Sequence, residues 1–149
     1  MSEIIVRKAV EADIPQIAVI EAESFSDPWT EDSLRSQLSQ ALGIFLAAEI
    51  DGTIVGYIIG SQDGDSAFID NIAAAGSERR KGVGTALMKA FLAELPETVC
   101  RAVLEVRESN IAAQKLYSRF GFKVAGVRKN LYSSPQEDGF VMICILDEG

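Results

Sequence analysis

The sequence has 149 residues, of which 14 are Lys or Arg and 22 are Asp or Glu, so its formal net charge is −8 at neutral pH. A chain of this length buries about two thirds of its unfolded surface, and we expect one domain over residues 1–149. The acidic balance argues against nucleic acid as a partner. It weakly favours a cationic or amine-bearing substrate.

Several function classes are excluded by residue types that are absent or rare. The absence of histidine excludes serine–histidine and cysteine–histidine catalysis and any histidine-ligated metal site, and we expect no metal. Cys100 and Cys144 lie in apolar runs, which predicts small buried side chains rather than a disulfide or a nucleophile. No apolar run approaches the ~18 residues of a membrane span, and early charges at Glu3, Arg7 and Lys8 do not fit a signal peptide. We expect a cytoplasmic protein without membrane contact, either a monomer or a weak dimer.

The first third of the chain is predicted to form a strand and two helices. Residues 4–7 form a short strand, Asp13 is a candidate N-cap, and Pro15 fits the first turn of a helix. The apolar residues that recur on one face of this helix are Ile14, Ile17, Ala18 and Phe25. A Ser-Asp-Pro-Trp segment ends the helix, and Thr30 can cap the next one.

Phe25 and Trp29 lie on either side of the proline in that segment. They are either anchors in the core or the wall of a substrate groove. Residue type alone favours the core, because large aromatic side chains are usually buried.

The remaining pattern predicts a mixed α/β domain. Strand-like runs at 44–50 and 53–59 are joined by Asp51-Gly52, a strong hairpin signal. The later predicted elements are strands at 66–75, 99–106, 122–132 and 140–146, and helices that begin near Val83 and Asn110, with Ser109 as the other possible cap and Gly121 ending the second. The resulting order, β-α-α-β-β-β-α-β-α-β-β, implies a central twisted sheet of about seven strands with helices on both faces.

A basic, glycine-containing stretch from Ser77 to Thr85 follows an apolar run. The apolar residues after it recur at helical spacing, at Val83, Ala86, Leu87, Ala90 and Phe91. Gly82 and Gly84 therefore lie on a strand-to-helix turn, where backbone N–H groups can converge on an anion. The preceding basic residues are Arg79, Arg80 and Lys81. They lie where the helix dipole favours negative charge, so a bound polyphosphate would stabilise them.

This stretch is either a flexible turn with solvated charges or a phosphate-binding loop. It is neither a P-loop nor a G-x-G-x-x-G fingerprint, because Leu87 occupies the position of the last glycine. The spacing of Arg79, Gly82 and Gly84 resembles the Q/R-x-x-G-x-G/A pyrophosphate loop of the GCN5-related N-acetyltransferases. We therefore predict phosphate binding here.

Glu105 and Tyr117 are the candidates for proton transfer. Alternation along its strand places Glu105 on the side opposite Leu104 and Val106, either paired with an arginine or beside the phosphate loop, and spacing supports the two equally. Tyr117 lies on the apolar face of the next helix, and its position alone favours core packing. Its other possible role is to protonate a leaving thiolate, because unperturbed pKa values are about 10 for a phenol and about 8.5 for a thiol.

Four segments resemble one branch of that family, the bacterial ribosomal-protein alanine N-acetyltransferases. Residues 104–122 are similar to its L-E-V-R-x-S-N-x-x-A-x-x-L-Y-x-x-x-G-F signature. Residues 25–30 resemble its F-P-W-[ST] loop, 71–73 its N-I-A-V strand and 128–132 its R-x-N-Y-Y segment. This chain differs in having Ala74 and Gly76 after N-I-A, two extra residues at 26–27, and Leu131 for the first aromatic of the Y-Y pair.

The resemblance implies roles for individual residues. Glu105 would be the general base, through water, for the incoming ammonium group, and Tyr117 would protonate the departing CoA thiolate. The implied cofactor-binding residues are Ile72, Ala73, Ala74, Arg79, Arg80, Lys81, Gly82, Val83, Gly84, Thr85 and Asn110. The implied acceptor groove is lined by Phe25, Trp29 and Tyr132.

The resulting hypothesis is an enzyme that transfers acetyl from acetyl-CoA to the N-terminal amine of a protein, such as the N-terminal alanine of a small-subunit ribosomal protein. One alternative is a small-molecule amine acetyltransferase, acting on a polyamine or an aminoglycoside-like compound. A second alternative is a non-catalytic acyl-CoA-binding sensor, which would have no use for Glu105 and Tyr117 together.

Overall fold

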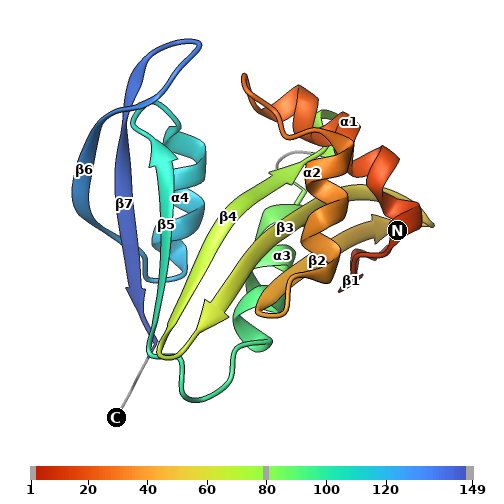
Figure 1. Ribbon diagram of the computed structural model, residues 1–149, viewed down its shortest axis with the longest axis horizontal. Coiled ribbons are helices and arrows are strands. Elements are labelled where there is room, and N and C mark those ends of the chain that lie inside the picture. Colours follow the sequence, from red (N-terminus) through yellow and green to blue (C-terminus); the bar gives the residue numbers. More distant parts are fainter. Residues whose placement is uncertain (1–2, 79–80, 147–149) are drawn as a thin grey trace.

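Seven strands form one mixed sheet in the computed structural model, which describes residues 3–78 and 81–146 (Figure 1). The strands are β1 (Ile5–Lys8), β2 (Gly43–Ile50), β3 (Thr53–Asp63), β4 (Ser66–Ala74), β5 (Arg101–Arg107), β6 (Lys123–Tyr132) and β7 (Glu137–Ile145). Their order across the sheet is β1-β2-β3-β4-β5-β7-β6. Only β4 and β5 pair in parallel; the other described neighbours are antiparallel. The expected seven-stranded mixed sheet is confirmed.

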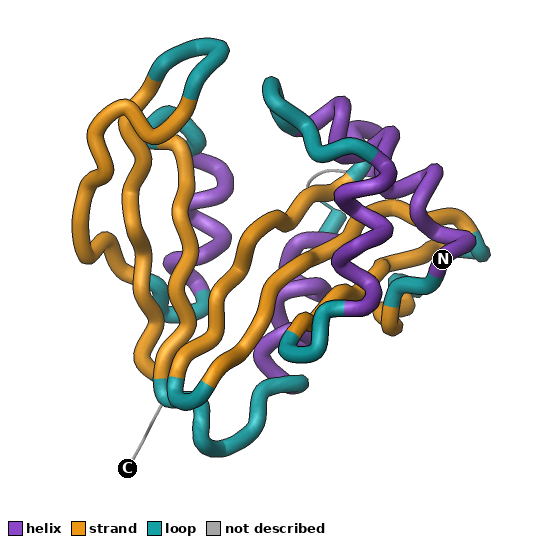
Figure 2. The backbone as a smooth tube through the Cα atoms, viewed as in Figure 1, coloured by secondary structure: helices purple, strands orange, loops and turns teal. Residues whose placement is uncertain are grey.

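Helices cover both faces of the sheet, also as expected (Figure 2). They are α1 (Ile14–Ser24), α2 (Glu31–Ser36), α3 (Val83–Ala93) and α4 (Ile111–Arg119). The larger hydrophobic cluster joins the sheet to the α3–α4 side through residues such as Leu87, Phe91 and Leu104. The smaller cluster joins β2 and β3 to α1 and α2 through residues such as Ile17 and Leu34. Each such buried side chain contributes about 1.5–3 kcal/mol, which holds the helices in place.

Most local signals form as predicted. Thr30 caps α2, since its Oγ1 accepts a hydrogen bond from the Ser33 N–H at 3.1 Å. Asp51 and Gly52 both have positive φ, 50° and 82°, as the tight β2–β3 hairpin requires. Gly121 follows α4 with a φ of 94°, a conformation that glycine adopts without strain.

Asp13 differs from its prediction. It occupies the N-cap position of α1, but its carboxylate makes no cap hydrogen bond to that helix. It instead accepts hydrogen bonds from the Arg7 guanidinium at 2.8 and 3.0 Å and from the Val10 N–H at 2.9 Å. A charge-assisted pair to Arg7 is stronger than a neutral cap bond, so it ties β1 to the start of α1.

Neither cysteine forms a disulfide in the described structure, and Cys144 is buried as expected. Cys100 is only half-buried and precedes β5, because that strand begins at Arg101 rather than at residue 99. No helix in the described part of the chain is long and apolar enough to span a membrane.

The parallel strands β4 and β5 diverge, and this divergence positions the site (Figure 1). Their pairing runs from Ser66 opposite Arg101 to Ile69 opposite Leu104 and then stops. On its other edge β4 stays paired with β3 up to Ala74. The stretch from Asp70 to Ala74 therefore has one backbone edge that is not used by the sheet.

Candidate active site

A cavity of about 550 Å³ lies where β4 and β5 diverge. One side is formed by α1, the α1–α2 loop and β4, and the other by β5, α4 and the β6–β7 loop. Seven residues predicted to act in the site line it together: Phe25, Trp29, Ile72, Glu105, Asn110, Tyr117 and Tyr132. They come from segments far apart in the sequence, so only the fold brings them together.

Glu105 faces this cavity from β5. Leu104 and Val106 are buried on the opposite side of the strand, so the predicted alternation is confirmed. Its carboxylate accepts a hydrogen bond from Arg128 Nη1 at 2.6 Å. The predicted pair with an arginine is therefore present, and the carboxylate also lines the cavity.

Tyr117 is buried, with 7% of its surface exposed, and lines the same cavity. Its ring packs edge-to-face on Phe122, with ring centroids 6.1 Å apart. Burial raises the pKa of Tyr117 well above its ordinary value of about 10. The phenol therefore stays protonated at neutral pH, as a proton donor must.

Asn110 is the N-cap of α4, one of the two candidates for that position. Its Oδ1 accepts a hydrogen bond from the Ala113 N–H at 3.1 Å. The side-chain oxygen is thus engaged by the helix, although the residue also lines the cavity. Its amide nitrogen has no hydrogen-bond partner among the described residues.

The predicted phosphate loop lies at the N-terminus of α3, outside the lining of the cavity. Gly82 is the N-cap with a φ of 89°, and no side chain caps the helix. Within the described residues no acceptor is bonded to the first N–H groups of α3, which makes this end suitable for an anion. Lys81 beside it is exposed and lies 3.7 Å from the Glu78 carboxylate. Arg79 and Arg80 lie outside the described residues.

Gly84 also has a packing role that its spacing did not indicate. A Cβ built on it would lie 2.9 Å from the Leu116 side chain, so the glycine lets α3 approach α4 closely. Val83 is buried in the core, with 1% of its surface exposed, and offers only its backbone to a cofactor. Thr85 follows in the first turn of the same helix.

The other residues predicted to bind the cofactor, Ile72, Ala73 and Ala74, lie on β4. Ala73 and Ala74 pair with Tyr57 and Gly56 of β3, and neither lines the cavity. Their opposite edge, like that of Ile72, lies beyond the end of the β4–β5 pairing. Main-chain N–H and C=O groups on this edge are available to a ligand.

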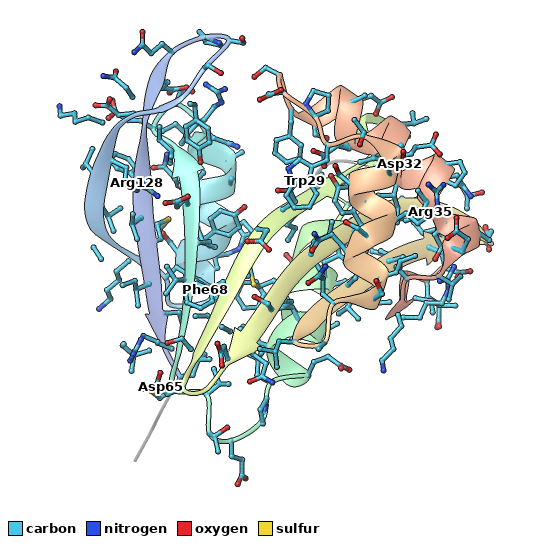
Figure 3. All side chains as sticks on the ribbon, in the orientation of Figure 1. Trp29, Asp32, Arg35, Asp65, Phe68 and Arg128 are labelled. Carbon is cyan, nitrogen blue, oxygen red and sulfur yellow. The ribbon has the colours of Figure 1, made fainter. Side chains whose placement is uncertain are left out.

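Phe25 and Trp29 both line the cavity from the α1–α2 loop. Phe25 is 36% exposed, so the predicted core role does not hold for it. Trp29 is half-buried and packs on the smaller core cluster, as predicted, and it also lines the cavity. Figure 3 shows Trp29 on the α1 side and Arg128 on the β6–β7 side of the space between β4 and β5.

Tyr132 lies across the cavity from the α1–α2 loop, with the Arg107 guanidinium 4.6 Å from its ring centroid. Arg107 also donates hydrogen bonds to the Glu137 carboxylate at 3.0 Å and to the Ser26 hydroxyl at 3.1 Å. Ser26, one of the two extra residues, is thereby joined to the opposite side of the cavity. Arg107 had no predicted role.

Glu21 of α1 is the second residue that the sequence analysis missed. Only 1% of its surface is exposed, yet its carboxylate lines the cavity and accepts three hydrogen bonds. The donors are the Tyr57 hydroxyl, Asn71 Nδ2 at 2.8 Å and the Trp29 N–H at 3.0 Å. Burial and the Glu21 hydrogen bond raise the pKa of Tyr57, which keeps this donor protonated. A single carboxylate thus joins α1, β3, β4 and the α1–α2 loop.

A model of the acetyltransferase (GNAT) family matches residues 14–122. The chain belongs to this family. The predicted family is confirmed, and the chain is an acetyltransferase of the GNAT type. Within the described residues, no group of three or more Cys, Asp or Glu side chains could hold a metal ion.

Two curated relatives are both named as ribosomal protein alanine N-acetyltransferases. A Bacillus subtilis (strain 168) protein, provisionally named a ribosomal protein bS18-alanine N-acetyltransferase, is 37% identical over 138 residues, covering 91% of each chain. The ribosomal protein bS18-alanine N-acetyltransferase of Escherichia coli (strain K12) is 32% identical over 133 residues, covering 87% of this chain and 89% of its own.

Two solved structures have a similar fold. The crystal structure of the ribosomal-protein-S18-alanine N-acetyltransferase from Escherichia coli matches with a TM-score of 0.89 and 28% identity, over 99% of this chain and 96% of that one. The Ard1 protein from Thermoplasma volcanium matches with a TM-score of 0.86 and 29% identity, over 97% of this chain and 99% of that one. The whole described fold is therefore that of the GNAT acetyltransferases.

Proposed function

We propose that this GNAT enzyme acetylates the N-terminal α-amine of a protein in the cytoplasm, most simply the N-terminal alanine of a small-subunit ribosomal protein, with acetyl-CoA as donor. The names of the curated relatives support this acceptor. The observation that carries the proposal is the cavity where β4 and β5 diverge. It places Glu105 and Tyr117 beside the free edge of β4.

Acetyl-CoA would lie along the diverging strands, with its pyrophosphate at the N-terminus of α3. The open N–H groups that follow Gly82 would bind the phosphate oxygens, and Arg79, Arg80 and Lys81 would supply positive charge. The free edge of β4 would hold the pantetheine and acetyl groups through Ile72, Ala73 and Ala74. Asn110 would contact the cofactor from the start of α4.

The reaction would be a direct attack of the amine nitrogen on the thioester carbonyl carbon. An α-ammonium group has a pKa near 8, so a water molecule held by the Glu105 carboxylate suffices to take its proton. A backbone N–H of the Asn71–Ala74 edge would stabilise the developing oxyanion. When the carbon–sulfur bond breaks, Tyr117 would give its proton to the CoA thiolate.

The acceptor would enter between the α1–α2 loop and the β6–β7 loop. Phe25 and Trp29 lie on one side of this entrance and Tyr132 on the other, so a peptide backbone can pass between aromatic side chains. The Ser26 contact to Arg107 narrows the same entrance. A narrow entrance suits an extended chain end.

The test uses one peptide that carries a free N-terminal alanine and an internal lysine, incubated with acetyl-CoA and analysed by mass spectrometry. We expect acetyl on the α-amine and little on the lysine. Acetyl mainly on the lysine, or rapid reaction of polyamines with no reaction of the peptide, would instead indicate the small-molecule alternative. A protein that binds CoA yet releases no thiol with any amine would be an acyl-CoA sensor.

A further inference from the structure

Asp70 lies in a β-bulge at the point where β4 leaves β5. Across β3, Ile59 pairs with Asn71 and Gly60 pairs with Ile69, so Asp70 is the extra residue of β4. Bulges of this kind redirect side chains and are frequent beside active sites. Asp70 lines the cavity, although the sequence motifs gave it no role.

The bulge turns Asp70 toward the same side of the sheet as Glu105. Ile69 packs in the larger core cluster, so Asp70 faces the opposite side, and Asn71 also reaches Glu21 of α1 on that side. Glu105 lies between Leu104 and Val106 of the larger cluster, so its side chain faces the α1 side as well. Ile69 and Leu104 are the last paired residues, which makes Asp70 and Glu105 the next residues on the two diverging strands.

Three other carboxylates that line the cavity already have donors. Glu105 accepts from Arg128, Glu137 accepts from Arg107 and the Ser109 N–H, and Glu21 accepts its three hydrogen bonds. Asp70 makes no ion pair or side-chain hydrogen bond with any described residue. Asp27 shares this property, but it lies on the α1–α2 loop rather than on one of the two diverging strands. Desolvation, together with the negative charge of Glu105, raises the pKa of Asp70.

We propose that Asp70 binds the protonated amine of the acceptor, next to the water that Glu105 activates. This assignment rests on the proposed amine acetyltransferase activity. An ammonium group has several N–H donors, so one can bind the Asp70 carboxylate while another gives its proton to the water held by Glu105. The two carboxylates then have separate functions: Asp70 selects a cationic amine and holds it, and Glu105 removes the proton.

The test compares steady-state kinetics of Asp70→Asn with those of Asp63→Asn, which makes the same change of charge at the exposed end of β3. For the alanine peptide we expect Asp70→Asn to raise KM about tenfold, because a hydrogen bond to a charged group is lost. We expect kcat to change less than about threefold. The KM for acetyl-CoA stays at the wild-type value. Asp63→Asn behaves as wild type, whereas Glu105→Gln lowers kcat.

An unchanged peptide KM in Asp70→Asn, or a loss of kcat alone, would overturn the assignment. Asp70→Ser, which removes the carboxylate with a smaller side chain, gives the same KM effect if the charge is the cause, and CoA binding by calorimetry confirms that both variants are folded. If the wild type acetylates polyamines but no peptide, the proposed acceptor is wrong, and the same KM comparison on the polyamine decides the role of Asp70. A wild type that acetylates no amine overturns both proposals.

Discussion

The buried carboxylate of Glu21 accepts a hydrogen bond from the backbone N–H of Trp29 at 3.0 Å. Through this bond the first helix holds the loop that forms one wall of the cavity. The same carboxylate binds Asn71 on the diverging strand, so the positions of the acceptor loop and of the β4 edge are set by one side chain. No cation is paired with Glu21 in the described structure, so its three donors are all neutral groups.

Glu21→Gln should loosen this wall of the cavity. The amide nitrogen cannot accept a hydrogen bond, so at least one of the three donors loses its partner, and we expect a loss of stability of about 1–3 kcal/mol. Trp29 is the single tryptophan, so intrinsic fluorescence reports on the loop directly. We expect red-shifted emission and a higher KM for the acceptor. The matched control is Glu23→Gln at an exposed position of the same helix, and equal behaviour of the two variants would disprove a positioning role.

Glu105→Gln should lower kcat most near neutral pH. The rate should recover in part at high pH, because a larger fraction of the amine is then already neutral and needs no base. The measurement is a pH–rate profile with the alanine peptide. Glu108→Gln, an exposed carboxylate just after β5, serves as the control and should match wild type. If the pH–rate profile of Glu105→Gln parallels that of wild type, Glu105 is not the general base and its ion pair with Arg128 has only a structural role.

Tyr117→Phe should slow turnover while the affinity for CoA changes little. The substitution removes the hydroxyl group and keeps the ring, together with its edge-to-face contact to Phe122. The melting temperature should therefore stay close to that of wild type. Because the folded-state pKa of Tyr117 is raised, its ionisation should not lower kcat below pH 10 or so. Single-turnover kinetics measure the chemical step, and an unchanged rate constant would refute the proton-donor role.

Reversing charge at the phosphate loop should weaken cofactor binding. We expect CoA to raise the melting temperature of the wild type, and this shift should largely disappear in Arg80→Glu with Lys81→Glu. The control reverses two exposed lysines elsewhere, Lys89 in α3 and Lys123 in β6. Calorimetry should show CoA binding to this control but not to the loop variant. If both double variants lose the shift equally, the effect comes from net charge rather than from a site.

Gly60→Ala should destabilise the sheet because β3, β4 and α3 approach closely there. An added Cβ would lie 2.7 Å from the Phe91 ring and would also collide with the Phe68 carbonyl oxygen. Overpacking of this kind costs about 1–3 kcal/mol. Gly126→Ala is the matched control, since its Cβ would meet nothing within 4 Å. Urea unfolding measures both, and equal free energies of unfolding would contradict the packing argument.

The sequence alone was sufficient to predict the order of the helices and strands and many of the residues at which they begin or end. Asp51-Gly52, Thr30, Asn110 and Gly121 act through the conformation of their own backbone and that of near neighbours, so their signals can be read locally. Alternation along β5 likewise placed Glu105 correctly, because strand geometry has a period of two. The family motifs indicated in advance most of the predicted residues that now share one cavity.

Tertiary structure alone decided which partners these side chains have. Asp13 binds Arg7 instead of capping its helix, Gly84 makes room for Leu116, and Glu105 is paired with Arg128 across β7. Glu21 depends on hydrogen bonds to residues of other segments, and Asp70 depends on a β-bulge. Neither feature can be recognised in the local sequence pattern. Hydrogen bonds and ion pairs act over a few ångströms, so a residue's partners depend on how distant segments pack, and local sequence spacing does not contain that information.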